Sequence, residues 1–346
     1  MMSYLVKKLG YALIILFSVA TVVFFLFSAS FPSAEEVLVS DRTDEQTLTA
    51  IKKELGLDQS LGRQYLLYLN DLSPISRYKK DKPPIPGIHL GKHWMVKGPY
   101  LRRSFQSGKL TSNILASSFK NTLVLAILAI FLGAVLGIVA GVFAAILKGT
   151  WWDRLILFLT TIGISVPSFF SAIIIGWLFG YLYSHITGLS LTGSLVDIDP
   201  VEGRVYKWKN AILPAVALGI RPLSIITQLS RNSMIDALGQ DYIRTARSKG
   251  LSKRKIYFKH ALRNALNPIL TSVSGWFASL LAGAFFIEYI FNWNGLGKVT
   301  IDALEMSDLP VIMGAILFVA SIFVLVNILV DISYTVLDPR IKLEEE

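Results

Sequence analysis

The stretch Asp241-Tyr242-Ile243-Arg244-Thr245-Ala246-Arg247-Ser248-Lys249-Gly250 lies in a basic segment, residues 231–268, that separates two long apolar runs. The segment holds nine Lys and Arg residues and two acidic residues. Asp241 is a favourable helix N-cap and Gly250 a favourable C-cap, while Arg247 and Lys249 suit the negative end of the helix dipole. The stretch therefore predicts one short, exposed helix between membrane spans, suited to docking on another protein.

The composition is typical of an integral membrane protein. Hydrophobic residues make up 53% of the 346 residues and charged residues 17%, whereas about 25% of a soluble domain is charged. Cysteine is absent and there are four His residues, so disulfides and thiol chemistry are excluded and a metal site has few available ligands. We therefore expect no metal and no cofactor.

Six apolar runs of about 20 residues predict six transmembrane helices and an all-α, polytopic membrane fold. The first run exceeds the core of a signal peptide, which is about 7–15 residues long, so we expect a retained anchor rather than a cleaved leader. The predicted spans are residues 9–31, 121–147, 155–183, 210–230, 269–288 and 309–330.

The short loops predict the orientation. With six crossings, Lys7 and Lys8, the loop 148–154, the basic segment 231–268 and the C-terminal cations all fall on one side. Positively charged loops stay in the cytoplasm. We therefore expect both termini inside the cell, and residues 32–120, 184–209 and 289–308 outside.

The stretch 241–250 resembles the cytoplasmic coupling loop of the membrane subunits of ABC importers. Thr245-Ala246 occupy the places of that loop's small-residue pair, and Gly250 that of its fixed glycine, while Arg244 stands where many of these importers carry Glu. The run Arg-Thr-Ala-Arg at 244–247 is similar to the peptide and nickel branch of the family. Further segments similar to the B-type peptide permease subunits are residues 54–59, 229–234, 260–268, 288–297 and 331–340.

The resemblance implies a permease subunit in the bacterial inner membrane that forms half of a translocation path for peptides. The implied partners are a homologous second permease subunit, two ATP-binding subunits and an extracytoplasmic substrate-binding protein. The chain has no Gly-x-x-x-x-Gly-Lys-Ser/Thr loop, so we expect ATP hydrolysis on a partner and no enzyme activity here. The residues expected to couple to the ATPase are Asp241, Tyr242, Arg244, Thr245, Ala246, Arg247, Lys249 and Gly250.

This reading divides the chain into an N-terminal helix, residues 1–31, an extracytoplasmic segment, residues 32–120, and a permease core of five helices, residues 121–346. Within the second part, residues 45–72 predict two short amphipathic helices, and residues 73–97 form an insertion rich in Pro and Lys. No helix is expected in that insertion. It is either a solvated surface loop or a contact for the binding protein.

Rival functions remain open. The same architecture imports nickel chelates or glycosides in relatives of this family. An ATP-independent channel would need a filter-like loop or a ring of charges, and neither is evident. An intramembrane enzyme would need two ionisable residues at helical spacing, and no predicted span contains such a pair.

A few residues inside the predicted spans stand out. Arg221, just before Pro222, either faces the translocation path and meets a substrate carboxylate or pairs with a neighbour or a free carbonyl. Pro167, followed by Ser168, predicts a kink that either shapes the helix or lines the gate. Gly133, Gly137 and Gly141 recur every fourth residue and predict close helix packing.

Overall fold

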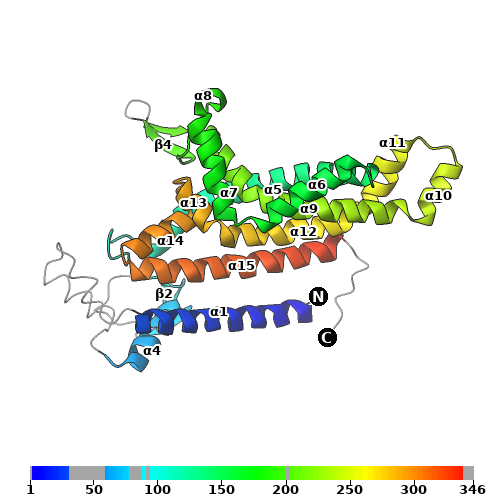
Figure 1. Ribbon diagram of the computed structural model, residues 1–346. Coiled ribbons are helices and arrows are strands. Elements are labelled where there is room, and N and C mark those ends of the chain that lie inside the picture. The colour runs from blue at the N-terminus through cyan, green and yellow to red at the C-terminus, as the bar shows by residue number, and fades with distance from the viewer. Residues whose placement is uncertain (1, 31–58, 78–86, 91–93, 200–202, 338–346) are drawn as a thin grey trace. The chain divides into compact units, whose positions relative to one another are not determined.

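The computed structural model describes residues 2–30, 59–77, 87–90, 94–199 and 203–337 (Figure 1). These residues are mostly helical, which confirms the all-α membrane fold, with two small antiparallel sheets added to it. The chain divides into two compact units, one of residues 1–117 with 300–321 and one of residues 118–299 with 322–346. Three helices continue from one unit into the other: α5 Thr111–Ile146, α14 Leu296–Glu305 and α15 Leu309–Leu337.

The first unit contains two helices and a small sheet besides its parts of α5, α14 and α15. Phe24 of the first helix packs on Tyr68 of the second, and Thr21 Oγ1 lies 2.8 Å from the Tyr65 hydroxyl. The sheet has the order β1-β3-β2, with Ile75 opposite Val96 and Gly87 opposite Lys97. Its elements are α1 Met2–Ser30, α4 Leu61–Leu72, β1 Ile75–Arg77, β2 Gly87–Leu90 and β3 Trp94–Lys97.

The strands add a feature that the sequence did not predict. Residues 73–97 were predicted as an insertion, either a solvated surface loop or a contact for the binding protein, and their described parts form the three-stranded sheet. No helix lies in those parts, as predicted from the prolines. Of the two amphipathic helices expected in residues 45–72, α4 is the second, and the first lies outside the described residues. Strand pairing depends on partners distant in sequence, so the composition of this segment did not reveal it.

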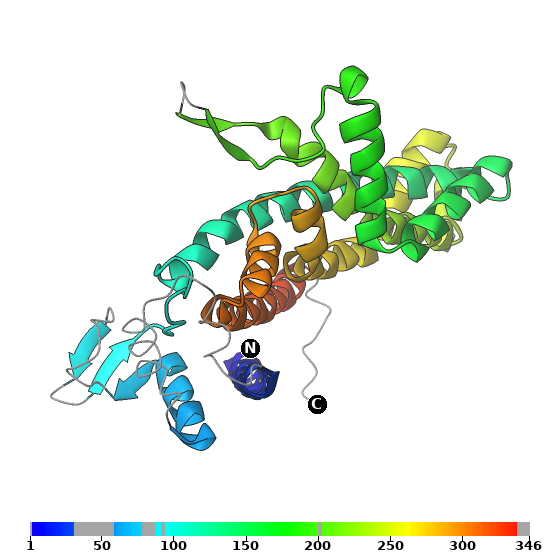
Figure 2. The same ribbon diagram turned by 60° about the vertical axis from the view of Figure 1, so that its left-hand side comes forward.

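The second unit is a layer of long helices that carries the short helices α10 and α11 at one end (Figure 1). Figure 2 shows α7 turned away from α6, and the β4–β5 hairpin beside it. The elements from α6 onward are α6 Trp151–Ser165, α7 Ser168–Ile175, the π-helix η1 Gly176–Leu182, α8 Ser184–Thr187, β4 Val196–Asp199, β5 Gly203–Tyr206 and the 3-10 helix η2 Trp208–Ala211. They continue with α9 Ile212–Leu238, α10 Asp241–Ser248, α11 Lys253–Lys255, the π-helix η3 Ile256–Ala261, α12 Leu262–Gly283 and α13 Phe285–Ile290.

The glycine spacing in α5 packs that helix closely against α9. A Cβ atom at Gly137 would lie 2.9 Å from the carbonyl oxygen of Leu223, and one at Gly133 would lie 3.2 Å from that of Gly219. Gly141 likewise faces Thr227. The close packing predicted from this spacing is confirmed.

The membrane spans agree in part with the six that the sequence predicts. Four helices among the described residues are long and apolar enough to cross a membrane, and there are five if the bent pair of α6 with α7 and η1 counts as one span. That pair bends by 108° around Pro167, which confirms the predicted kink. The run predicted as 269–288 is instead α12, which begins at Leu262 and ends at Gly283, followed by the separate helix α13. α12 is too polar to be among the spans identified by hydropathy, so the number six stays a prediction.

Candidate functional site: the exposed helix between α9 and α12

The helix α10 is held to its own subunit by two side chains. Ile243 is fully buried and Ala246 is 5% exposed. They lie three residues apart and therefore on one face of the helix. Both belong to a hydrophobic cluster that joins α10 to the ends of the long helices and to η3. Its other buried members are Val142, Ala145, Met234, Ala237, Ile256, Ala261 and Ala265.

The caps of α10 differ by one residue from those expected. Gln240, with an extended ψ of 154°, is the N-cap, and Asp241 is the first helical residue, where its carboxylate still lies at the positive end of the dipole. Lys249 is the C-cap and Gly250 follows it with φ +73°. An N-cap precedes the helical φ/ψ region, and ψ at 240 lies outside that region.

Gly250 lies just after the C-cap of α10 and allows the helix to end there. The Gly250 N–H donates to the Arg247 carbonyl at 2.9 Å, and the Leu251 N–H donates to the Ala246 carbonyl at 3.3 Å. These two bonds are those of a Schellman motif, which needs a left-handed residue at this position. The glycine is therefore required by the way the helix ends.

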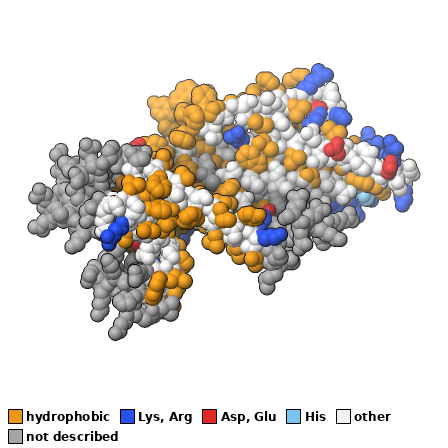
Figure 3. Space-filling model, turned by 90° about the horizontal axis from the view of Figure 1, so that it is seen from below, with side chains coloured by type: hydrophobic (Ala, Val, Ile, Leu, Met, Phe, Trp, Pro, Cys, Tyr) orange, Lys and Arg blue, Asp and Glu red, His pale blue; other side chains and the backbone are white. Residues whose placement is uncertain are grey.

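The rest of α10 is exposed. Tyr242, Arg244, Thr245 and Arg247 face away from the subunit, as do Ser248 and the following Lys249. Lys and Arg side chains gather at the end of the second unit that carries α10 and α11 (Figure 3). The contact of Arg244 with Asp241, 3.4 Å long between side chains 78% and 94% exposed, holds the guanidinium only weakly. The exposed face thus combines an aromatic ring, hydroxyls and cations that remain available to a partner.

These contacts divide the eight predicted coupling residues into two groups. Ala246 packs inward and Gly250 shapes the helix end, so neither presents a side chain to a partner. Sequence reasoning missed the second inward residue, Ile243. The signal that could have found it is the apolar pair at i and i+3 in an otherwise polar helix.

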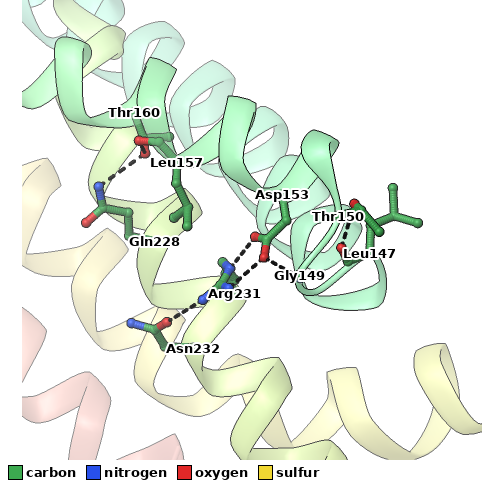
Figure 4. A network of polar contacts seen from close by, with 9 residues as sticks. All are labelled: Leu147, Gly149, Thr150, Asp153, Leu157, Thr160, Gln228, Arg231 and Asn232. Atoms are coloured by element: carbon green, nitrogen blue, oxygen red, sulfur yellow. Dashed lines mark hydrogen bonds and ion pairs between the residues drawn. The ribbon is translucent and has the colours of Figure 1, made fainter.

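A second polar contact fixes the start of α6 to α9 (Figure 4). Arg231 donates from Nε to Asp153 Oδ1 at 2.6 Å and from Nη2 to Oδ2 at 2.8 Å, and the Gly149 N–H donates to the same carboxylate at 2.9 Å. The Asp153 side chain is 4% exposed and that of Arg231 16%. About two turns along α6 and one turn along α9 from this pair, Gln228 Nε2 donates to Thr160 Oγ1 at 3.1 Å. This pairing could not be predicted from the sequence, because the partners are 78 residues apart.

The residues predicted for the translocation path lie elsewhere. Arg221 is exposed on α9, and none of the described residues forms an ion pair or hydrogen bond with it. It precedes the end of α9 by 17 residues, or about 26 Å along the helix. Pro167 is exposed at the bend, and Ser168 begins α7 half-buried. Arg221 is therefore well separated from the exposed helix α10 along α9.

A further cluster, absent from the predicted sites, fixes the segment between α13 and α14. Glu288 is fully buried. It accepts hydrogen bonds from Thr122 Oγ1 at 2.7 Å and from the Gly297 N–H at 2.6 Å. The Trp293 Nε1–H donates to the Asn121 carbonyl at 3.0 Å. A side chain at Gly295 would collide with the Glu288 carboxylate, which explains why this stretch contains a glycine there.

Metal chemistry has no visible support in the described part of the chain, where no three His, Asp or Glu side chains cluster. The described residues offer an exposed polar helix, a cation on α9 without a partner among them, and packed apolar helices.

Comparison with known proteins assigns the chain to a family. The model of the binding-protein-dependent transport system inner membrane component matches residues 137–343, and the model of the N-terminal part of such components matches residues 1–126. The dipeptide transport system permease protein DppB of Alkalihalophilus pseudofirmus is 32% identical, with 99% of this chain and 100% of the relative covered.

Two other relatives agree over the same length. The di/tripeptide transport system permease protein DppB of Pseudomonas aeruginosa is 32% identical, over 99% of each chain. The glutathione transport system permease protein GsiC of Escherichia coli K12 is also 32% identical over 99% of each chain. The chain therefore belongs to the inner-membrane components of binding-protein-dependent transport systems, as a multi-pass permease subunit of an ABC importer and not an enzyme.

Proposed function

We propose that this chain is the B-type membrane subunit of a peptide importer, and that α10 transmits the ATPase cycle to the membrane helices. The observation that carries the proposal is the division of α10 into a two-residue anchor, Ile243 and Ala246, and an exposed polar face. The relatives named for dipeptides, di/tripeptides and glutathione support a peptide cargo over nickel chelates or glycosides. The chain would work with a homologous second permease subunit, two ATP-binding subunits and an extracytoplasmic binding protein.

The connection from α10 to the membrane supports this role. α10 contacts η3, and η3 continues directly into α12. A π-helical turn is less regular than an α-helix and is frequent at functional positions. Pro268 lies in the second turn of α12 and removes one backbone hydrogen bond there. A push on the exposed face of α10 would therefore reach α12 through a segment that can adjust.

The coupling proposal predicts the effect of reversing charge on this face. In the double variant Arg244→Glu/Arg247→Glu, peptide uptake should fall at least about tenfold, because a docking contact that loses 1.4 kcal/mol weakens tenfold. Both side chains are exposed, so the amount of protein in the membrane should not change. ATP-driven uptake and ATPase activity of the complete complex in vesicles measure the effect.

The matched control is Lys253→Glu/Arg254→Glu. It makes the same charge change in the same cytoplasmic loop, on exposed side chains of α11 outside α10. Its uptake should stay within about twofold of the unmodified protein. Equal uptake in the two double variants would reject docking through α10.

We further propose that both termini lie in the cytoplasm, from the positive-inside rule, and that residues 1–31, 32–120 and 121–346 serve as anchor, outer segment and permease core. Because the chain lacks cysteine, two exposed serines provide a matched test. Ser190→Cys should react with an impermeant thiol reagent added to intact cells, and Ser252→Cys should react only after the cells are opened. The reverse pattern would invert the topology.

Arg221, Pro167 and Ser168 remain our proposed residues of the translocation path. Arg221 has no partner among the described residues, which favours a role toward cargo or the second permease subunit over an ion pair within this chain. An ATP-independent channel is not favoured, since the family is one of binding-protein-dependent transporters.

A further inference from the structure

One side of α6 is exposed and apolar, and it begins with two tryptophans. Trp151 and Trp152 are the first residues of the helix, and their rings, 65% and 54% exposed, meet edge to face with centroids 5.2 Å apart. Phe158 follows Trp151, and Leu159 follows Trp152, by seven positions, or about two helical turns. Both are exposed, as is Ile162 one turn later. These five side chains form one face, which we call the outer face of α6.

The opposite side of α6 is polar and is held by α9. Asp153 and Thr160, which are also about two turns apart, point toward Arg231 and Gln228 of α9 (Figure 4). Both are buried, at 3% and 4% exposure. The polar side of the helix thus meets its own subunit, and the apolar outer face is left to whatever surrounds the subunit.

The outer face has the length of one lipid leaflet. From Trp151 to Ile162 the helix rises about 16 Å, about half of the roughly 30 Å hydrocarbon layer. α6 ends at Ser165, before the bend around Pro167. An apolar surface of this length matches acyl chains, and tryptophan rings favour the boundary between the acyl chains and the headgroups. The tryptophans lie at the end of the face where that boundary would be.

Two cations flank the tryptophans and provide a second, independent observation. Lys148 and Arg154 are exposed, and neither side chain forms a hydrogen bond or ion pair with any residue the structure describes. The acidic residue between them, Asp153, is turned inward and accepts bonds from Arg231 and from the Gly149 N–H. Residues 148–154 therefore present two positive charges at the end of the outer face, which an anion would complement.

We propose that the start of α6 binds an anionic phospholipid of the cytoplasmic leaflet. Lys148 and Arg154 bind the phosphate, the tryptophan pair lies beside the glycerol backbone, and the acyl chains follow the outer face toward Ile162. A lipid fits better than a protein because charge, aromatic rings and hydrocarbon follow one another in the order of a lipid molecule, over the length of one leaflet. The choice of leaflet rests on the proposed topology, whereas the contact itself depends on neither the cargo nor α10.

Brominated lipids test the contact, because bromine quenches tryptophan fluorescence only at close range. The complete complex is reconstituted in nanodiscs of phosphatidylcholine that contain a rising fraction of brominated phosphatidylglycerol. The quenching that disappears in Trp151→Phe/Trp152→Phe belongs to this pair, and those substitutions keep an aromatic ring at each position. The dependence of that quenching on lipid composition gives the affinity of the site for phosphatidylglycerol relative to phosphatidylcholine.

Two double variants distinguish a local site from the general positive charge of the loops. In Lys148→Gln/Arg154→Gln the relative affinity for phosphatidylglycerol should fall at least about tenfold, since two cations near an anionic surface contribute up to about 30-fold, or about 2 kcal/mol. The control Lys253→Gln/Arg254→Gln removes the same charge from exposed side chains of α11 and should change the relative affinity by less than about twofold. Equal losses in the two variants would overturn the local site.

Two further results would also overturn the proposal. If brominated phosphatidylcholine alone fails to quench the tryptophan pair, a partner subunit rather than lipid covers the outer face. If soluble glycerol 3-phosphate prevents quenching by brominated phosphatidylglycerol, the two cations bind free phosphate compounds and the acyl chains contribute nothing. Peptide uptake plays no part in these measurements, so their failure would be distinct from a failure of the proposed peptide import.

Discussion

Replacing Ile243 by Ala is expected to abolish peptide uptake even though Ile243 touches no partner. The side chain is fully buried in the cluster with Met234 and Ile256, themselves 0% and 3% exposed. Truncation of a buried Ile to Ala costs about 2–5 kcal/mol. An isolated helix of eight residues is unstable in water, so α10 depends on this packing. The ratio of molecules with α10 packed on the cluster to those with α10 detached should fall at least about 30-fold.

Two measurements distinguish detachment of α10 from its hydrophobic cluster from loss of its docking surface. Trypsin should cut more rapidly after the Lys253-Arg254-Lys255 run when α10 detaches, and uptake should fall in parallel. Ile243→Val, which costs only about 0.5–1.5 kcal/mol, should retain both properties. Unchanged trypsin sensitivity in Ile243→Ala would contradict the anchoring role. Ala246→Glu is a poor probe of docking for the same reason, because it places a carboxylate in the buried contact that holds α10.

Removal of the Asp153 carboxylate should reduce the stability of the assembled protein more than any exposed charge change. Asp153→Ala leaves Arg231, 16% exposed, without its bidentate partner. Breaking a buried pair in this way costs about 3–5 kcal/mol, because one charge stays buried and unpaired. The thermal stability of the purified complex in detergent and its amount in the membrane should both fall.

A second ion pair of the same unit is the control. Lys207 Nζ lies 2.7 Å from Asp197 Oδ2, with side chains 50% and 53% exposed, so Asp197→Ala should cost only about 0–1 kcal/mol. The double variant Asp153→Leu/Arg231→Met should recover much of the loss, because it removes both charges together. If Asp153→Ala proves no more harmful than Asp197→Ala, the pair does not hold α6 to α9.

The sequence alone determined the features that depend on neighbours within one helix turn or one window of the chain. The apolar runs predicted membrane helices, Pro167 predicted the break before α7, and the glycines of α5 predicted close packing. Gly250 was readable as a helix end, because the Schellman bonds join residues three and five positions apart. The N-cap was off by one residue, since Gln240 and Asp241 differ only in a local ψ angle.

Only the tertiary structure decided which side of each helix is covered. The apolar pair in α10 is present in the sequence, but its burial depends on what packs beside it. The Asp153–Arg231 and Thr122–Glu288 contacts join residues 78 and 166 positions apart, and the strands of residues 75–97 depend on their mutual pairing. Pairing over such distances is set by how the helices and strands pack, and local propensity does not predict it.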